Sequence, residues 1–176
     1  MIEIYIAENN FNRGLGILDV INKVTNREFS FTCDYSVTLA RLNNTSLKEI
    51  LGRTRSGNLD LMVFPLFFSE EGRMTVNSQE DYVAELDGVK LGLRYREEGY
   101  RGPILLTLDE YFPFSFEQSV ERACGYNWSL ERNDKCLLNL YSTEMPVESR
   151  TQILSHLLRD EPKVEFSVID HNPRGN

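Results

Sequence analysis

The sequence contains little of what usually holds metals or disulfides. Among 176 residues there are three cysteines and two histidines. Cys33, Cys124 and Cys136 are far apart and form no CxxC pair, so we interpret them as buried thiols. His156 and His171 have no cysteine or histidine at ligand spacing. The sequence therefore predicts neither a disulfide framework nor a metal centre of these residue types, and we expect no cofactor.

Long apolar runs are also missing. No run approaches the ~20 apolar residues that a helix needs to span a bilayer. The N-terminal segment MIEIYIAENN has no basic lead and no apolar stretch of signal-peptide length. We therefore expect no membrane contact and a cytoplasmic location, where a reducing environment makes free cysteines normal.

Positive charge is in short supply as well. The chain has 19 Lys and Arg against 27 Asp and Glu, a formal net charge of -8 at pH 7. This excess repels a phosphate backbone unless a local basic stripe overrides it. The cations nearest to such a stripe are few and spread out: Arg53, Arg55, Lys90, Arg94, Arg96 and Arg101. Nucleic acid is therefore not an expected partner.

Strand and helix patterns alternate along nearly the whole chain. Period-two or continuous apolar segments predict strands, and apolar residues at helical spacing behind serine or proline start signals predict helices. Strands are predicted at residues 2–7, 29–37, 59–68, 104–108, 136–141 and 164–169. Helices are predicted at residues 11–24, from 47 to a glycine at 52 or 57, and at 82–99, 116–124 and 147–158.

This alternation predicts the fold class. Strands that take turns with helices favour an α/β fold with a mostly parallel, doubly wound sheet, right-handed crossovers and here an extra C-terminal strand. The chain length suits one domain, which we place at residues 1–170. Residues 171–176 are interpreted as a frayed tail.

Segments 4–10 (IYIAENN), 60–65 (DLMVFP) and 87–107 resemble the receiver domain of bacterial response regulators. The likeness covers about residues 2–159 and implies a five-strand, flavodoxin-like fold. In receivers the third strand ends on the phosphorylated aspartate, whereas the matching residue here is Pro65. The segment 87–107 ends on Thr107, where receivers carry a switch serine or threonine.

The charged positions of the receiver site are mostly lost. Glu8 keeps one member of the acidic turn, but Asn9 stands where the magnesium-binding aspartate would be. Asn139 stands where a lysine would contact the phosphoryl group. The resemblance thus implies a pseudo-receiver without enzymatic activity. Such a domain would be a regulatory or adaptor module that binds a protein partner independently of phosphorylation. Homodimerisation and membership of a larger assembly stay open.

Three acidic residues offer an alternative. Glu8, Asp109 and Glu110 follow predicted strands at their carboxyl ends, the edge where open α/β sheets bind ligands. Together they could hold magnesium and support an enzyme or a nucleotide-binding domain. Solvated acids at helix starts are the competing interpretation.

Aromatic residues gather in the loop after the predicted fourth strand. If this loop is exposed, it forms a partner-binding patch, and if it is buried, it is a lid over the core. Two phenylalanines near the end of the third strand would enlarge either the patch or the lid. The residues concerned are Tyr111, Phe112, Phe114 and Phe116, with Pro113 between them, and Phe67 and Phe68.

Overall fold

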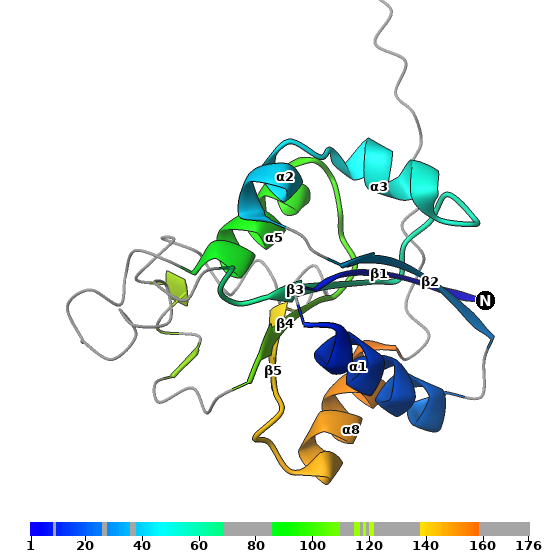
Figure 1. Cartoon of the computed structure of the whole chain (residues 1–176), viewed down its shortest axis with the longest axis vertical. Coiled ribbons are helices and arrows are strands. Elements are labelled where there is room, and N and C mark those ends of the chain that lie inside the picture. Colours follow the sequence, from blue (N-terminus) through cyan, green and yellow to red (C-terminus); the bar gives the residue numbers. More distant parts are fainter. Residues whose placement is uncertain are drawn as a thin grey trace, which may run out of the picture.

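Five parallel strands form one sheet at the centre of the computed structural model (Figure 1). Their order across the sheet is β2-β1-β3-β4-β5, and each neighbouring pair runs parallel. This confirms the predicted α/β fold, and the order is that of flavodoxin-like proteins. The strands are β1 Ile2–Glu8, β2 Phe29–Tyr35, β3 Leu61–Pro65, β4 Ile104–Leu108 and β5 Leu138–Ser142.

The structure describes residues 1–8, 10–25, 28–35, 38–68, 86–109, 115–116, 118, 120–121 and 138–158. Several predicted features lie outside these residues. They are Asn9, the helix start at 78–81, Glu110, the aromatic residues 111–114, Cys124, Cys136, the strand at 164–169 and the tail at 171–176.

Helices cover both faces of the sheet. Figure 1 shows α1 and α8 on one face, here the α1/α8 face, and α2, α3 and α5 on the other, here the α5 face. No helix in the described part of the chain has the length and apolarity to cross a bilayer. The helices are α1 Phe11–Val24, α2 Leu39–Asn43, α3 Leu47–Arg53, α5 Asp87–Glu97 and α8 Val147–Leu157.

The two faces are built by the alternation of side chains along each strand. On β1, Ile4 and Ile6 join the core under α1 and α8, whereas Tyr5 and Ala7 join the core under the opposite helices. All residues of β1, β3 and β4 are buried, as expected for strands covered on both faces.

The capping residues in the sequence predict the start of some helices correctly and of others incorrectly. The predicted capping box at the start of α3 is present, with Ser46 and Glu49 each bonded to the other's backbone. The helix expected from residue 82 begins only at Asp87, because Leu86 has non-helical backbone angles. The short helix α2 has no counterpart in the sequence-based prediction.

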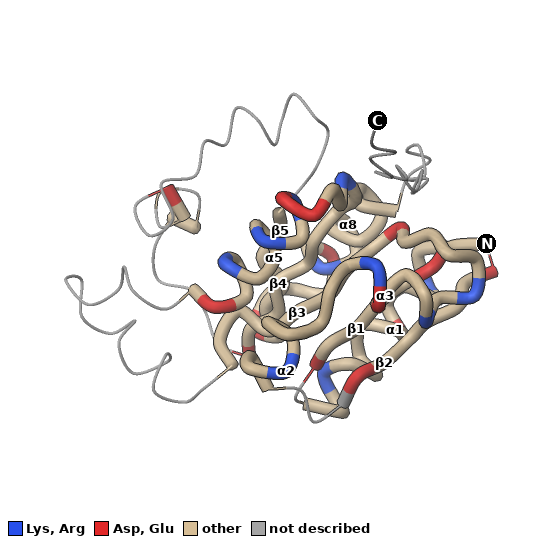
Figure 2. The backbone as a smooth tube through the Cα atoms, turned by 90° about the horizontal axis from the view of Figure 1, so that it is seen from above, with Lys and Arg blue, Asp and Glu red and all other residues tan. Residues whose placement is uncertain are grey.

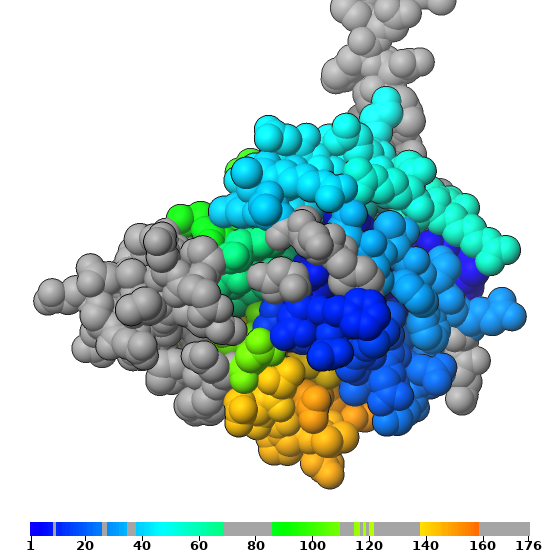
Figure 3. Space-filling view, viewed as in Figure 1, coloured from blue at the N-terminus to red at the C-terminus, as the bar shows by residue number. Residues whose placement is uncertain are grey.

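Charged residues of both signs are interspersed along the described backbone (Figure 2). Exposed cations pair locally with acids: Lys23 lies 2.6 Å from Asp19, and Arg53 lies 2.8 Å from Asp34. On the α1/α8 face the two helices are in contact and form adjoining parts of the surface (Figure 3). The site described next lies where α1 begins.

Candidate functional site

Glu8 is the last residue of β1, at the edge of the sheet where the strands end. Its side chain is 0% exposed. A carboxylate in such a place is costly unless it is paired and hydrogen-bonded. The partners of Glu8 therefore decide what this edge can do.

Arg13, in the first turn of α1, is the main partner. Its Nε donates to Glu8 Oε2 at 2.8 Å and its Nη2 donates to Glu8 Oε1 at 2.5 Å, a bidentate pair. The turn between the two residues is fixed by Asn10, whose side chain caps α1 by accepting from Arg13 N. Asn10 N donates in turn to Glu8 Oε1 at 3.1 Å.

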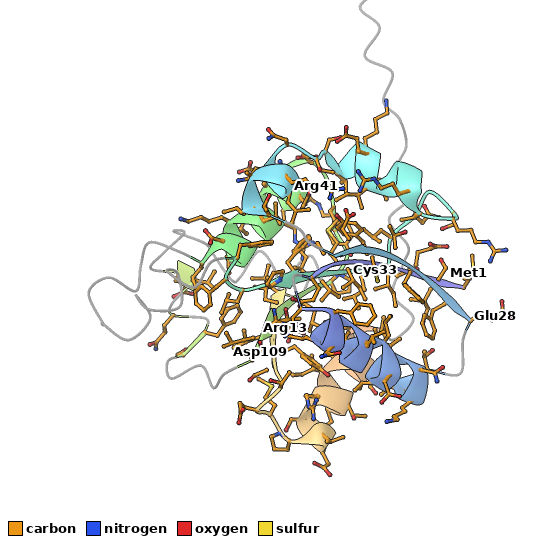
Figure 4. The ribbon with its side chains drawn as sticks, in the orientation of Figure 1. Met1, Arg13, Glu28, Cys33, Arg41 and Asp109 are labelled. Carbon is orange, nitrogen blue, oxygen red and sulfur yellow. The ribbon has the colours of Figure 1, made fainter. Side chains whose placement is uncertain are left out.

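Asp109, just after β4, completes an ionic bridge. Arg13 Nη1 lies 2.8 Å from Asp109 Oδ2, so one guanidinium joins both carboxylates. Figure 4 shows the labelled Arg13 and Asp109 side by side near the start of α1. The side chain of Arg13 is 6% exposed, whereas that of Asp109 is 34% exposed. The bridge therefore runs from the buried edge of the sheet to its surface.

Thr107 supplies the remaining bond to Glu8. Its buried hydroxyl donates to Glu8 Oε2 at 2.6 Å and lies 3.2 Å from the carbonyl oxygen of Phe64. Glu8 thus accepts two bonds on each oxygen, which fills the roughly four acceptor sites of a carboxylate. We call Glu8, Arg13, Thr107 and Asp109 the Arg13 corner.

The electrostatics of this corner favour the charged arginine. Burial by itself would lower the pKa of Arg13, but its hydrogen bonds to Glu8 and the negative charges of Glu8 and Asp109 raise it above the ordinary value. Arg13 is therefore a cation at neutral pH. It supplies positive charge where the sequence suggested a bound metal.

Pro65 lies beside the corner, at the end of β3. It is paired with Thr107 across the sheet and is buried. The start of α5 presses on it: a Cβ atom at Gly88 would lie 2.2 Å from the carbonyl oxygen of Pro65. This contact requires glycine and leaves the end of β3 tightly enclosed.

Asn139 is not brought to the corner. Its half-buried position near the start of β5 is paired with Leu105, whereas the residue paired with Thr107 is Tyr141. Tyr141 is 1% exposed, and burial raises its pKa, with the charge of Arg150 acting against that shift. The side chain next to Thr107 on β5 is therefore a neutral phenol.

The predicted metal cluster and aromatic patch are only partly within the described residues. Glu8 and Asp109 do lie at one corner, but they share the guanidinium of Arg13. No group of three or more His, Cys, Asp or Glu that could hold a metal occurs among the described residues. Of the aromatic set, Phe67, Phe68 and Phe116 pack against the core on the α5 face.

Arg13 is the residue that sequence reasoning missed. The available signal was its place: the only cation in the first turn of the predicted helix, five residues after a strand-end glutamate. Comparison with known proteins adds no further residue, because no protein-family model, no curated protein and no solved structure matches the chain.

Proposed function

We propose that the protein is a non-catalytic, receiver-like regulatory or adaptor module that acts by binding a protein partner without being phosphorylated. The observation that carries this proposal is the Arg13 corner. The acceptor sites of the Glu8 carboxylate are filled by the chain's own donors, so this carboxylate, at the edge that binds magnesium in receivers, is already paired with a cation. The flavodoxin-like strand order supports the comparison with receivers.

The residue at the end of β3 supports the same proposal. Phosphoryl transfer to a protein needs a nucleophile and a cation that stabilises the developing charge. Pro65 has no nucleophilic group, and its surroundings are closed by Gly88 and Thr107. A divalent cation at Glu8 would have to displace Arg13 first.

The first test combines magnesium with a small phosphodonor. We expect millimolar magnesium to leave the melting temperature of the wild-type protein unchanged, because Glu8 has no open acceptor site. The phosphodonor is expected to label neither the wild-type protein nor Pro65→Asp, since Glu8 is already occupied by Arg13 and offers no open position to a metal. Thermal unfolding and mass spectrometry give the two readouts.

Two variants make this test decisive. Arg13→Ala removes the cation that Glu8 and Asp109 share, so magnesium should now raise the melting temperature of this variant. Lys23→Ala, an exposed site on the same helix, should behave like wild type. Magnesium-dependent stabilisation of the wild-type protein that disappears in Glu8→Gln would instead support a magnesium-dependent enzyme or nucleotide-binding domain. Labelling of Pro65→Asp would also contradict the proposal.

A further inference from the structure

Glu3 is a second buried carboxylate of β1, near the opposite end of the strand from Glu8. Its exposed fraction is 2%. Glu3 Oε2 accepts from the backbone N–H of Arg55 at 3.2 Å, whereas Glu3 Oε1 is buried and has no hydrogen-bond partner among the described residues. Glu8, by contrast, accepts two bonds on each oxygen. A buried carboxylate with so few bonds is costly, so a further partner of Glu3 is expected.

The arginines of the segment that lies over Glu3 are directed to other groups. Arg53 Nη1 lies 2.8 Å from Asp34 Oδ2, and Arg55 Nη1 lies 3.9 Å from Met1 Sδ. In the described part of the chain, no Lys or Arg nitrogen lies within 4.0 Å of a carboxylate oxygen of Glu3. Glu3 therefore lacks the ion pair that compensates the charge of Glu8.

A second buried oxygen without a described partner lies on the neighbouring strand. Ser30 of β2 is in register with Glu3, and its Oγ is buried and makes no hydrogen bond to a described residue. Both side chains are on the α5 face, because side chains alternate along a strand and Ile4 lies on the α1/α8 face. Paired strands are about 4.8 Å apart, so the two side chains are neighbours.

The groups around this pair favour a small cation. Carboxylate, hydroxyl and main-chain carbonyl oxygens are the ligands of hard cations. The end of α3 brings main-chain groups over the two strands, since Arg53 O accepts from Thr32 Oγ1 at 3.3 Å. A monovalent ion balances the single charge of Glu3, whereas a divalent ion would leave a buried positive charge uncompensated. Both oxygens are shielded from solvent, which favours a small ion.

We propose that Glu3 Oε1 and Ser30 Oγ bind a sodium ion between β1 and β2, beneath the end of α3. Main-chain carbonyl groups of the segment after α3 supply further oxygens. Glu3 and Ser30 are far apart in the sequence and become neighbours only in the sheet, so the ion binds the folded chain and stabilises it. The inference goes beyond the proposed function and does not depend on it.

Thermal unfolding in sodium chloride and in choline chloride at equal concentration tests the inference, because screening by salt is then the same. We expect the melting temperature of the wild-type protein to be higher in sodium chloride by about 3 °C. Glu3→Gln, which keeps the shape of the side chain and removes its charge, should abolish this difference, and Ser30→Ala should reduce it. Glu97→Gln makes the same chemical change at an exposed position of α5 and should keep the full difference.

Sodium-23 NMR of the wild-type protein is a readout that needs no variant. Sodium relaxation should be faster with the protein present and should return to the free value when the protein is unfolded in urea. Equal melting temperatures in the two salts overturn the inference, as does a sodium effect that persists in Glu3→Gln. Equal stabilisation by potassium would contradict a site of sodium size.

Arg55 provides the test of the competing arrangement, in which a guanidinium pairs with Glu3. Arg55 is exposed, and we expect Arg55→Ala to keep the difference between sodium and choline. If Arg55→Ala instead lowers the melting temperature equally in both salts and the wild-type protein shows no sodium effect, Arg55 is the partner of Glu3 and the proposed ion is absent.

Discussion

The side chains of Arg13 and Arg94 are both largely buried, but they bind different partners. Arg13 joins two carboxylates at the end of the sheet and is almost fully buried. Arg94, on α5, is 27% exposed and donates to backbone carbonyls at the end of α2, those of Leu42, Asn43 and Thr45. One arginine neutralises acids, and the other caps a helix end.

The difference between the two sites lies in what removal leaves behind. Without Arg13, two carboxylates stay close together, one of them fully buried and without a cation. Without Arg94, a few carbonyl groups of α2 lose their donor, but the part-exposed position lets water replace it. The same type of residue is therefore expected to contribute quite different free energies of unfolding.

The largest effect is expected for Arg13→Ala. Removing one partner of a buried ion pair costs about 3–5 kcal/mol, because an uncompensated charge remains. Urea unfolding in magnesium-free buffer measures this loss. Adding Glu8→Gln to the same chain should recover part of it, since the stranded charge is then gone. If the double variant is as unstable as the sum of the single variants, charge compensation is not the reason for the loss.

An intermediate effect is expected for Arg94→Ala. Buried acceptors that lose a charged donor cost about 1–3 kcal/mol, and the exposed side of this site reduces the loss. Lys48→Ala, an exposed cation on α3, serves as the control and should unfold at the same urea concentration as wild type. A loss for Arg94→Ala that equals the loss for Arg13→Ala would remove the distinction between the two sites.

The smallest effect concerns Tyr95, next to Arg94. Its hydroxyl donates to Thr45 O at 3.0 Å, and Tyr95→Phe should cost about 1 kcal/mol at pH 7. Burial raises the pKa of Tyr95 to about 12, partly offset by the charge of Arg94. The raised pKa stabilises the fold below the unfolded-state value of about 10, and this contribution is lost as the pH rises through the folded-state value.

The fall in unfolding free energy between pH 10 and pH 12 should therefore be shallower in Tyr95→Phe than in wild type, over a range set by the two pKa values. Urea unfolding at several pH values measures both slopes. Some alkaline loss will remain, because burial also raises the pKa of Tyr5 and of Tyr141. Identical slopes would mean that Tyr95 does not titrate differently in the two states.

The sheet could be predicted from sequence because its signals are local. Continuous apolar segments such as 61–65 and 104–108 have the length and composition of central strands, and the order of strands and helices restricts the topology. The strand-end positions of Glu8, Pro65 and Thr107 follow from the same pattern. The sequence pattern alone therefore predicts that these residues lie at the carboxyl-end edge of the sheet.

The partners of these residues could not be predicted in the same way. The contact between Glu8 and Arg13 depends on the turn that joins β1 to α1 and on the Asn10 cap. The spacing of apolar residues along the sequence gives no information about either feature. The bond from Thr107 to Glu8 joins residues 99 positions apart. Asn139 was matched to a family position by counting along the chain, whereas its neighbour depends on the register between β4 and β5.

A cation that belongs to the chain behaves differently from one that diffuses in. Arg13 is tied to Glu8 by only five residues, so its effective concentration at the carboxylate is set by the turn and not by the medium. Chelators and dialysis, which strip a bound metal ion from a protein, leave this charge in place. The positive charge of the corner therefore does not depend on the supply of metal ions.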